Sequence, residues 1–428
     1  MAKWRPMKPF PSDFLFGVSI GAHQCEGGDD GSDWYRWALR PGHILDGSDQ
    51  NPGSGHWLHF RDDLALAHKL GMNAVCIGVN WARIQPAPDC FDAEALEHYR
   101  QVFQLASSLD MTVLGVLYHT ALPRWIADRG GWQAPECPDH FEAYTRETVR
   151  MLGEWCLHWI PVQEAECLVT RLCREKKWPG SGLGVRHEAV LRNTLAEAHV
   201  RAAEAIRESI SQAVIGLSVR GIPVEPWDEH SPWDMRLAEK EQERLNRAFP
   251  EAVFRASGSD GADFIALSYQ GVLRTRFAAG RFRYGFSLPV DQDGRAVDFD
   301  ELQPSSDGLE EVLLLLSAFQ KPIAVTGLGF AADDDRERCR FLCDHAGRLL
   351  TLARREEPSL KIQGLFYSPF LDGFEWHHGC ARRCGLVHVK RPGLERTPNP
   401  SAWLWKDIAQ HQEVRPGTAA RYCGEEEI

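Results

Sequence analysis

Eight apolar, strand-like runs alternate with amphipathic helical stretches along almost the whole chain. The runs are Phe14–Gly21, Asn73–Val79, Val113–Tyr118, Trp159–Gln163, Val214–Val219, Asp263–Ser268, Ile323–Thr326 and Gln363–Tyr367. Between and after them, residues 56–71, 94–110, 140–155, 187–210, 309–320 and 336–356 carry apolar side chains at intervals of three and four, as amphipathic helices do. This alternation predicts a (β/α)8 TIM barrel, an α/β fold.

An open, doubly wound sheet is the main alternative to a barrel. That fold commonly carries a Gly-x-Gly-x-x-Gly turn after an early strand, and the sequence has none there. Because α/β barrels often run long as one domain, residues 1–428 are expected to form a single domain. The polar, turn-rich stretch 284–308 is interpreted as a long loop before the seventh barrel strand.

Composition and charge narrow the class of protein. A formal net charge of −12 argues against nucleic acid or an acidic membrane as a partner. The sequence has neither a secretory signal pattern nor an apolar run of about 18 residues, so a cytoplasmic protein with reduced cysteines is expected. The spacing of His377, His378, Cys380 and Cys384 fits no standard pair of zinc-ligand doublets. Neither a metal nor another cofactor is therefore predicted, and the oligomeric state is left open.

Polar side chains follow several of the expected strands at their carboxyl ends, where chemistry gathers in a barrel. They are Gln24, His119, Gln163, Glu164, Tyr269 and Glu375, the last followed by Trp376. Such a ring supplies hydrogen-bonding groups together with an aromatic stacking face. A polyhydroxylated ligand needs both, so the pattern predicts a sugar-binding site.

Several segments carry a resemblance to a known family. They are residues 10–27 (FPSDFLFGVSIGAHQCEG), 66–86 (LAHKLGMNAVCIGVNWARIQP), 117–132 (LYHTALPRWIADRGGW), 263–270 (DFIALSYQ), 370–376 (FLDGFEW) and 395–408 (ERTPNPSAWLWKDI). Together they resemble the family 1 glycoside hydrolases, retaining β-glucosidases built on a (β/α)8 barrel. The resemblance extends over roughly residues 8–411.

The resemblance implies roles for individual residues. Gln24, His119, Glu375 and Trp376 match the positions that bind the sugar in the family. Glu164, in the segment VQEA, matches the general acid/base, and Tyr269 matches the tyrosine that contacts the nucleophile.

The departures from the family pattern are as informative as the matches. Gly327, in VTGLG, stands where the family has its nucleophilic glutamate, and Cys76 stands where an arginine pairs with that glutamate. Gln163 replaces an asparagine that holds the sugar, and Thr120 and Ser368 each replace a tryptophan of the sugar pocket. The resemblance thus implies a divergent member of the family that lacks its nucleophile.

Glycine at position 327 removes the ordinary retaining mechanism, which needs two carboxylates about 5–5.5 Å apart. Asp333, Asp334 and Asp335 are close in sequence, but acidic residues favour helix N-termini and these are expected to begin the next helix. An arginine left without its carboxylate would cost about 3–5 kcal/mol. We therefore interpret Gly327 and Cys76 as a joint change.

Three functions remain open at this point. The first is a glycosyl-transferring enzyme that uses an activated sugar donor, with Glu164 as acid or base and space around Gly327, Cys76 and Ser368 for a bulky donor group. The second is a glycoside hydrolase in which water attacks directly. The third is a non-catalytic protein that binds a sugar or a partner.

Two basic clusters favour the first function. One holds Arg171, Arg174, Lys176 and Lys177 after the fourth strand; the other holds Arg274, Arg276, Arg281 and Arg283 after the sixth. Both are expected to rim the barrel mouth, where guanidinium groups suit phosphate oxygens. A sugar, sugar phosphate or nucleotide sugar is the expected ligand.

Overall fold

The computed structural model describes residues 14–278, 283–297, 301–354 and 360–424. Eight parallel strands close into a barrel in the order β1-β11-β10-β7-β5-β4-β3-β2. Their bounds are β1 Leu15–Ile20, β2 Ala74–Gly78, β3 Thr112–Tyr118, β4 His158–Val162, β5 Val214–Gly221, β7 Phe264–Tyr269, β10 Ile323–Leu328 and β11 Ile362–Tyr367. Each falls on one of the eight expected runs, so the predicted barrel is confirmed.

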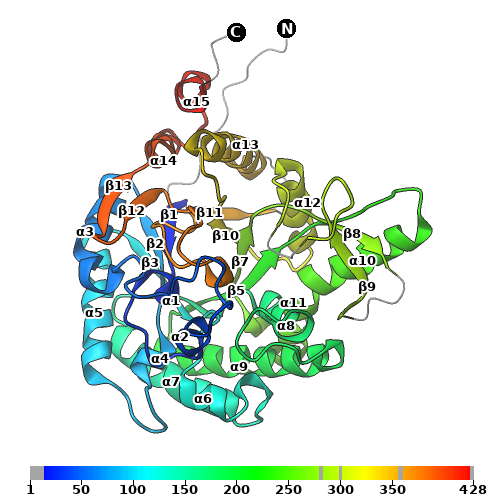
Figure 1. Ribbon diagram of the computed structural model, residues 1–428. Coiled ribbons are helices and arrows are strands. Elements are labelled where there is room, and N and C mark those ends of the chain that lie inside the picture. Colours follow the sequence, from blue (N-terminus) through cyan, green and yellow to red (C-terminus); the bar gives the residue numbers. More distant parts are fainter. Residues whose placement is uncertain (1–13, 279–282, 298–300, 355–359, 425–428) are drawn as a thin grey trace.

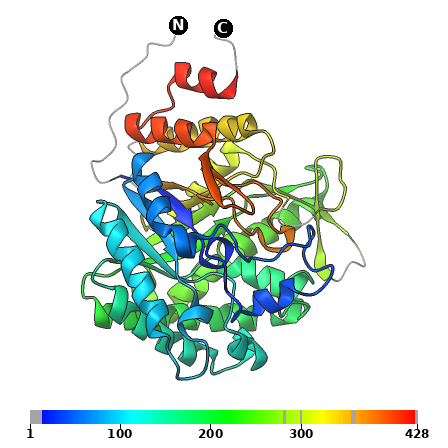
Figure 2. The ribbon, with the colours of Figure 1, turned by 60° about the vertical axis from the view of Figure 1, so that its left-hand side comes forward.

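The larger helices surround the barrel (Figure 1). They are α3 His56–Lys69, α5 Ala93–Ser108, α7 Cys137–Leu152, α8 Ala165–Arg174, α9 Glu188–Ser209, α10 Pro232–Asn246, α11 Ala248–Ser257, α12 Ser306–Ser317, α13 Asp335–Ala353 and α14 Pro400–His411. Shorter helices are α1 Ala22–Cys25, α2 Asp33–Ala38, α4 Trp81–Ile84, α6 Arg124–Asp128 and α15 Pro416–Cys423, with 3-10 turns at Gly131–Gln133, Val185–His187, Gly258–Gly261 and Trp376–His378. At one side of the barrel α15 packs on α13 and α14 (Figure 2).

Helix α13 begins at the aspartates Asp334 and Asp335, as expected from the sequence. Asp334 is its N-cap, with a side chain that accepts a hydrogen bond from the Arg336 N–H, and Asp335 is its first residue. Asp335 is further held by an ion pair with Arg338 and by the Ser401 hydroxyl. These carboxylates therefore cap a helix and are not among the groups that line the barrel mouth.

A small sheet outside the barrel corrects one prediction. Strands β6 Val224–Pro226, β8 Leu273–Phe277 and β9 Arg283–Val290 form it, and α10 packs against it, at the right of Figure 1. The first part of the stretch interpreted as a loop is thus strand β9. It pairs with β8, and the buried hydroxyls of Thr275 and Ser287 join the two strands at 2.6 Å. A further hairpin consists of β12 Val387–Lys390 and β13 Glu395–Pro398.

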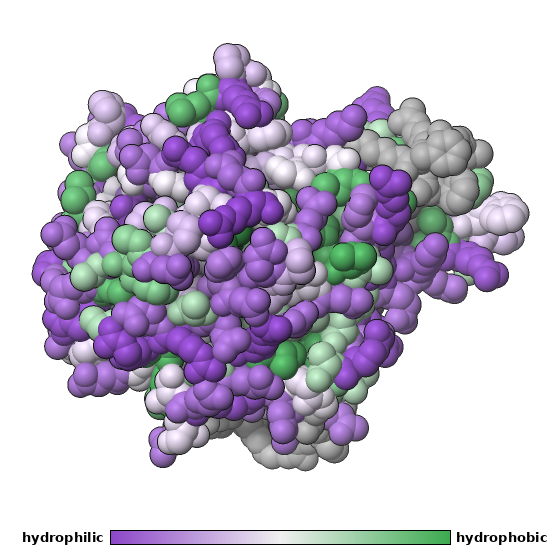
Figure 3. Space-filling view, turned by 90° about the horizontal axis from the view of Figure 1, so that it is seen from below, coloured by the Kyte–Doolittle hydropathy of each residue, from purple (hydrophilic) through white to green (hydrophobic). Residues whose placement is uncertain are grey.

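Side chains along each barrel strand point alternately into two apolar layers, one inside the barrel and one under the helices. Side chains that point inward pack as a compact group: Ala74, Cys76, Leu114, Val116, Ile160, Phe264, Ala266, Ala324 and Phe366. Those that point outward pack under the helices. Hydrophilic side chains cover most of the molecular face in Figure 3, with hydrophobic ones scattered among them. Successive residues of a strand point to opposite faces, so this parity decides which strand-end residues reach the barrel mouth.

Free thiols account for all twelve cysteines, and eight of these are buried.

Of the described helices, none combines the length and apolar character needed to cross a membrane. Within the same residues, no group of three or more His, Cys, Asp or Glu side chains is arranged to hold a metal ion.

Candidate active site

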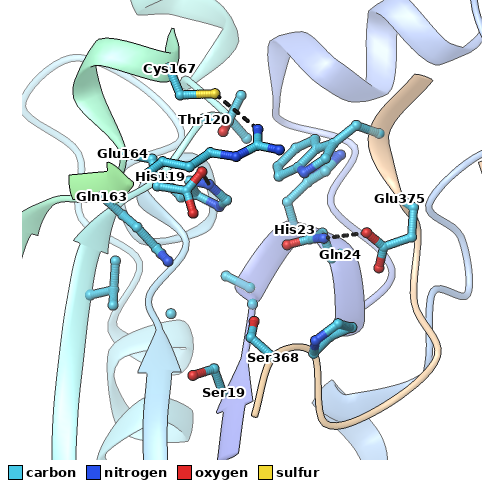
Figure 4. A pocket seen from close by; sticks show the side chains of 18 of the residues that line it. Ser19, His23, Gln24, His119, Thr120, Gln163, Glu164, Cys167, Ser368 and Glu375 are labelled. Atoms are coloured by element: carbon cyan, nitrogen blue, oxygen red, sulfur yellow. Dashed lines mark hydrogen bonds and ion pairs between the residues drawn. The ribbon is translucent and has the colours of Figure 1, made fainter. Parts of the chain in front are cut away.

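A cavity of about 200 Å³ opens at the carboxyl ends of the strands. Most of the expected sugar-site residues line it together: Gln24, Cys76, His119, Thr120, Gln163, Glu164, Ser368, Glu375 and Trp376. Figure 4 shows Glu164, His119 and Gln163 on one side of this cavity, which we call the sugar pocket after the ligand predicted from the sequence, with Gln24 and Glu375 on the other. The folding of distant segments thus assembles the constellation that the resemblance implied.

Glu164 follows the end of β4 by two residues and is the N-cap of α8. Its backbone is left-handed, with φ 51° and ψ 41°, which is a strained conformation for a residue with a side chain. Its N–H donates a hydrogen bond to the Ser218 hydroxyl at 3.1 Å, and its Oε2 lies 3.9 Å from His119 Nε2. The surrounding structure therefore holds an unfavourable backbone in order to present this carboxylate to the pocket.

The electrostatic environment of Glu164 keeps it ionised. Burial raises the pKa of this carboxyl, but contact with His119, the positive charge of Arg220 and a contact with Ser268 outweigh burial and lower the pKa to about 2. At neutral pH the group is consequently a carboxylate.

This environment predicts a specific pH dependence of stability. Because the folded-state pKa of about 2 lies below the ordinary value of 4.5, ionised Glu164 stabilises the fold above pH 4.5, and this contribution is lost as the pH falls toward 2. The difference in unfolding free energy between wild type and Glu164→Gln should then shrink by on the order of 2 kcal/mol over that range. Urea denaturation at a series of pH values measures it, and a pH-independent difference would contradict the assigned environment.

The opposite wall holds the expected sugar-binding groups. Gln24 Nε2 donates a hydrogen bond to Glu375 Oε2 at 3.3 Å. Trp376, whose φ is 53°, stacks on His23 with ring centroids 5.6 Å apart, and His23 is fixed by Asp29 at 2.6 Å. The aromatic face and the amide–carboxylate pair are thus both held in place.

Gly327 lies buried in β10, beside a register shift against β7. A Cβ atom at position 327 would lie 2.8 Å from Ser268 Oγ, and Gly327 is not among the residues that line the pocket. The expected open space beside Gly327 is therefore taken up by Ser268, whereas Cys76 and Ser368 do face the pocket. Burial raises the pKa of the Cys76 thiol to about 12, so this group is not a thiolate nucleophile at neutral pH.

The structure corrects the role expected for Tyr269. This side chain points out of the barrel, with Ile265 and Leu267, and its hydroxyl donates a hydrogen bond to the Ser305 carbonyl at 2.6 Å. Gln270, one residue on, lines the pocket instead and accepts a hydrogen bond from Arg220 at 2.7 Å.

Tyr269→Phe should therefore leave sugar binding and turnover within about twofold. It should lower the free energy of unfolding by about 1 kcal/mol through the lost hydrogen bond to Ser305. Isothermal titration and urea denaturation test the two parts separately. A tenfold loss of binding at unchanged stability would contradict the outward placement.

The basic clusters are placed differently from the prediction. Arg171 lines the pocket and stacks on Trp178, 3.8 Å from its ring centre. Arg174 instead makes buried ion pairs with Glu188 and Glu241. Arg274 lies on β8 and forms an ion pair with Glu225 at 3.0 Å.

The other predicted phosphate-binding residues do not reach the pocket or are not described there. The exposed Lys176, the half-buried Lys177 and the half-buried Arg276 are not among the lining residues. Arg281 lies outside the described residues, and Arg283 begins β9 with its side chain undescribed.

Two lining arginines were missed by sequence reasoning, Arg220 and Arg382. Arg220 is the second-last residue of β5 and lies on the inward face, since it shares the parity of Gly216 and Ser218. It donates hydrogen bonds to Gln270 and to the Cys167 sulfur. Counting alternate residues along the fifth expected strand would have placed the Arg220 side chain on the inward face. No comparable signal marks Arg382, which follows the last barrel strand in an irregular segment.

A carbohydrate-active (β/α)8 barrel is the class that this fold and pocket define. The chain matches the model of glycosyl hydrolase family 1 over residues 7–267 and 291–414, and it belongs to that family. It is 24% identical to beta-glucosidase A of Acetivibrio thermocellus over 94% of this chain and 98% of the relative. It is 26% identical to a chloroplastic galactolipid galactosyltransferase of Arabidopsis thaliana, over 84% of this chain and 58% of the relative.

Solved structures agree with the family assignment. A beta-glycosidase from Pyrococcus horikoshii superposes with a TM-score of 0.86 at 26% identity, covering 97% of this chain and 98% of the other. A beta-glucosidase from Thermotoga maritima in complex with glucoimidazole superposes with a TM-score of 0.84 at 21% identity, covering 94% and 99%.

Proposed function

We propose that the protein transfers a glycosyl group from an activated, phosphate- or nucleotide-linked sugar donor to an acceptor hydroxyl, with Glu164 as the proton acceptor. One observation carries this proposal: among the described residues that line the pocket, the only carboxylates are Glu164 and Glu375, and Gln24 bonds to Glu375. Position 327, where the family's nucleophile is expected, is a glycine closed off by Ser268. An activated donor needs no enzyme nucleophile.

The charges around the pocket support a phosphate-type leaving group. Arg171, Arg220 and Arg382 line the cavity, and guanidinium groups bind phosphate oxygens through paired hydrogen bonds. In the proposed step the acceptor oxygen bonds to the anomeric carbon while the bond from that carbon to the phosphate oxygen breaks. The acceptor proton passes to Glu164, and the phosphate leaves as an anion. The relative named as a galactosyltransferase supports transfer chemistry on this barrel.

Glycoside hydrolysis is the second candidate, because relatives in this family are named as glucosidases. Position 327 counts against it, since ordinary retaining hydrolysis needs a second carboxylate there and this chain has a glycine. A non-catalytic sugar-binding role would use the same Gln24, Glu375 and Trp376 wall.

The test is a screen of sugar nucleotides, glycosyl phosphates and aryl β-glycosides, with and without acceptor alcohols. Transfer from a phosphate-linked donor is expected, and Arg220→Gln or Arg171→Gln should weaken donor binding about tenfold or more. Arg274→Gln is the matched control, because that arginine lies on β8 away from the lining residues. Hydrolysis of aryl glycosides without transfer would favour the second candidate, and binding without turnover would favour the third.

A further inference from the structure

A second cavity, of about 310 Å³, lies beside the sugar pocket. The two cavities share four lining residues: Tyr118, Thr120, Leu168 and Trp178. Thr120 stands where the family resemblance places a tryptophan, so a small side chain now lies at the boundary between them. We call this second space the side cavity.

The wall of the side cavity is mainly aromatic and aliphatic. Four tryptophans and five leucines line it: Trp34, Trp37, Trp132, Trp178, Leu122, Leu168, Leu172, Leu183 and Leu191. Its carboxyl group, Asp33, already accepts a hydrogen bond from the Leu122 N–H at 2.9 Å, and burial raises the pKa of Asp33 to about 7. Arg36 is paired with Asp128 at 2.6 Å. The polar side chains are therefore largely engaged with the protein.

Three indole N–H groups are the exception. The Nε1 atoms of Trp37, Trp132 and Trp178 are buried and have no hydrogen-bond partner within the part of the chain that the structure describes. All three residues line the side cavity, and Trp178 also lines the sugar pocket. A buried donor without a partner is costly, so an occupant that brings acceptor oxygens would satisfy them.

We propose that the side cavity binds a planar aryl group carrying oxygen acceptors, as a phenolic compound does. A sugar ring fits poorly, since its many hydroxyls would find few partners among engaged polar groups and hydrocarbon walls. An aromatic ring stacks on tryptophan faces, and its oxygens can accept hydrogen bonds from the indole donors. A cavity of about 150 Å³ holds benzene, so the volume here suits one or two fused rings.

Helix α8 links this site to the sugar pocket. Glu164 caps the helix, and Leu168, which lines both cavities, follows four residues later, about 6 Å along the axis. An aryl group held against Leu168 would place its hydroxyl toward Glu164. That the aryl compound is the acceptor rests on the proposed function; its binding in the side cavity does not.

Direct titration tests the binding without any sugar donor. Umbelliferone, a hydroxylated two-ring compound, is the probe in isothermal titration of the full chain. Leu172→Trp fills the side cavity from a residue outside the sugar pocket and should weaken umbelliferone binding at least tenfold. Leu105→Trp, another partly buried helix leucine, is the matched control and should leave binding unchanged. Trp37→Phe keeps the ring but removes the donor, and should weaken binding about threefold to tenfold.

Each outcome bears on the proposal. Loss of binding in Leu172→Trp and Trp37→Phe, with Leu105→Trp and Gln24→Ala like wild type, supports it. No umbelliferone binding to wild type overturns it, as does equal binding in wild type and both side-cavity variants. Binding lost only in Gln24→Ala overturns it as well, because the probe would then occupy the sugar pocket. Failure of glycosyl transfer alters none of these results and counts against the proposed function alone.

Discussion

Glu164→Gln is expected to lower the rate of glycosyl transfer by about 10²- to 10⁴-fold, the usual contribution of a positioned acid–base group. Glutamine has nearly the same shape and leaves the backbone hydrogen bond to Ser218 intact, but it cannot accept the acceptor's proton. The loss should fall on kcat, because Gln24 and Glu375, two of the expected sugar-binding residues, lie on the opposite wall and are left unchanged. Steady-state kinetics with the best donor and acceptor from the screen measure it.

Glu375→Gln is the comparison for this experiment. The hydrogen bond from Gln24 ends on Glu375, so this change should act mainly on KM for the donor. The assignment of Glu164 as the proton acceptor would be wrong if its substitution left kcat within about threefold of wild type.

Cys76→Arg should lower the free energy of unfolding by about 3–5 kcal/mol. Cys76 packs inside the barrel with Ala74, Leu114 and other apolar side chains and is 3% exposed. An arginine there would bury a charge, and the position that is expected to have supplied its carboxylate is glycine. Denaturant unfolding measures the change, and the exposed Cys90→Arg is the control, with an expected effect below about 0.5 kcal/mol.

The double variant Cys76→Arg with Gly327→Glu sharpens this test. If the two positions form one pair, the double variant should be less destabilised than the sum of the single changes, by about 1–3 kcal/mol of coupling. Gly327→Glu alone should also destabilise, because Ser268 has to move to make room for its side chain. Additive effects, or a Cys76→Arg variant as stable as wild type, would contradict a joint change at these positions.

The sequence predicts the barrel well because its signal is repeated eight times and comes from local periodicity. The strand-end residues Gln24, His119, Glu164 and Glu375 were also found from sequence, since every barrel strand ends at the same rim. Tyr269 and Gln270 show where such reasoning fails. Neighbouring residues at a strand end point to opposite faces of the barrel, so an assignment that is wrong by one residue selects the wrong side chain. Here Gln270 shares the inward parity of Ala266 and Ser268, and Tyr269 does not.

The basic clusters and the side cavity depend on long-range packing. Arg174 is neutralised by Glu188 and Glu241, which are 14 and 67 residues away in sequence, so its charge was wrongly assigned to the barrel mouth. The side cavity draws on α2, the segment after β3, α8 and α9, which are brought together only by the closed barrel. Local sequence patterns do not predict contacts between residues so far apart in the chain.

The cysteine side chains differ in solvent exposure. Their reaction with a thiol reagent can therefore report how the native structure opens. A thiol reagent added to the native protein meets Cys90 at the surface, whereas Cys156 next to β3 and Cys339 in α13 become accessible only when the surrounding elements separate. The order in which these sulfurs are alkylated would therefore trace how the barrel comes apart, strand by strand, without any introduced label.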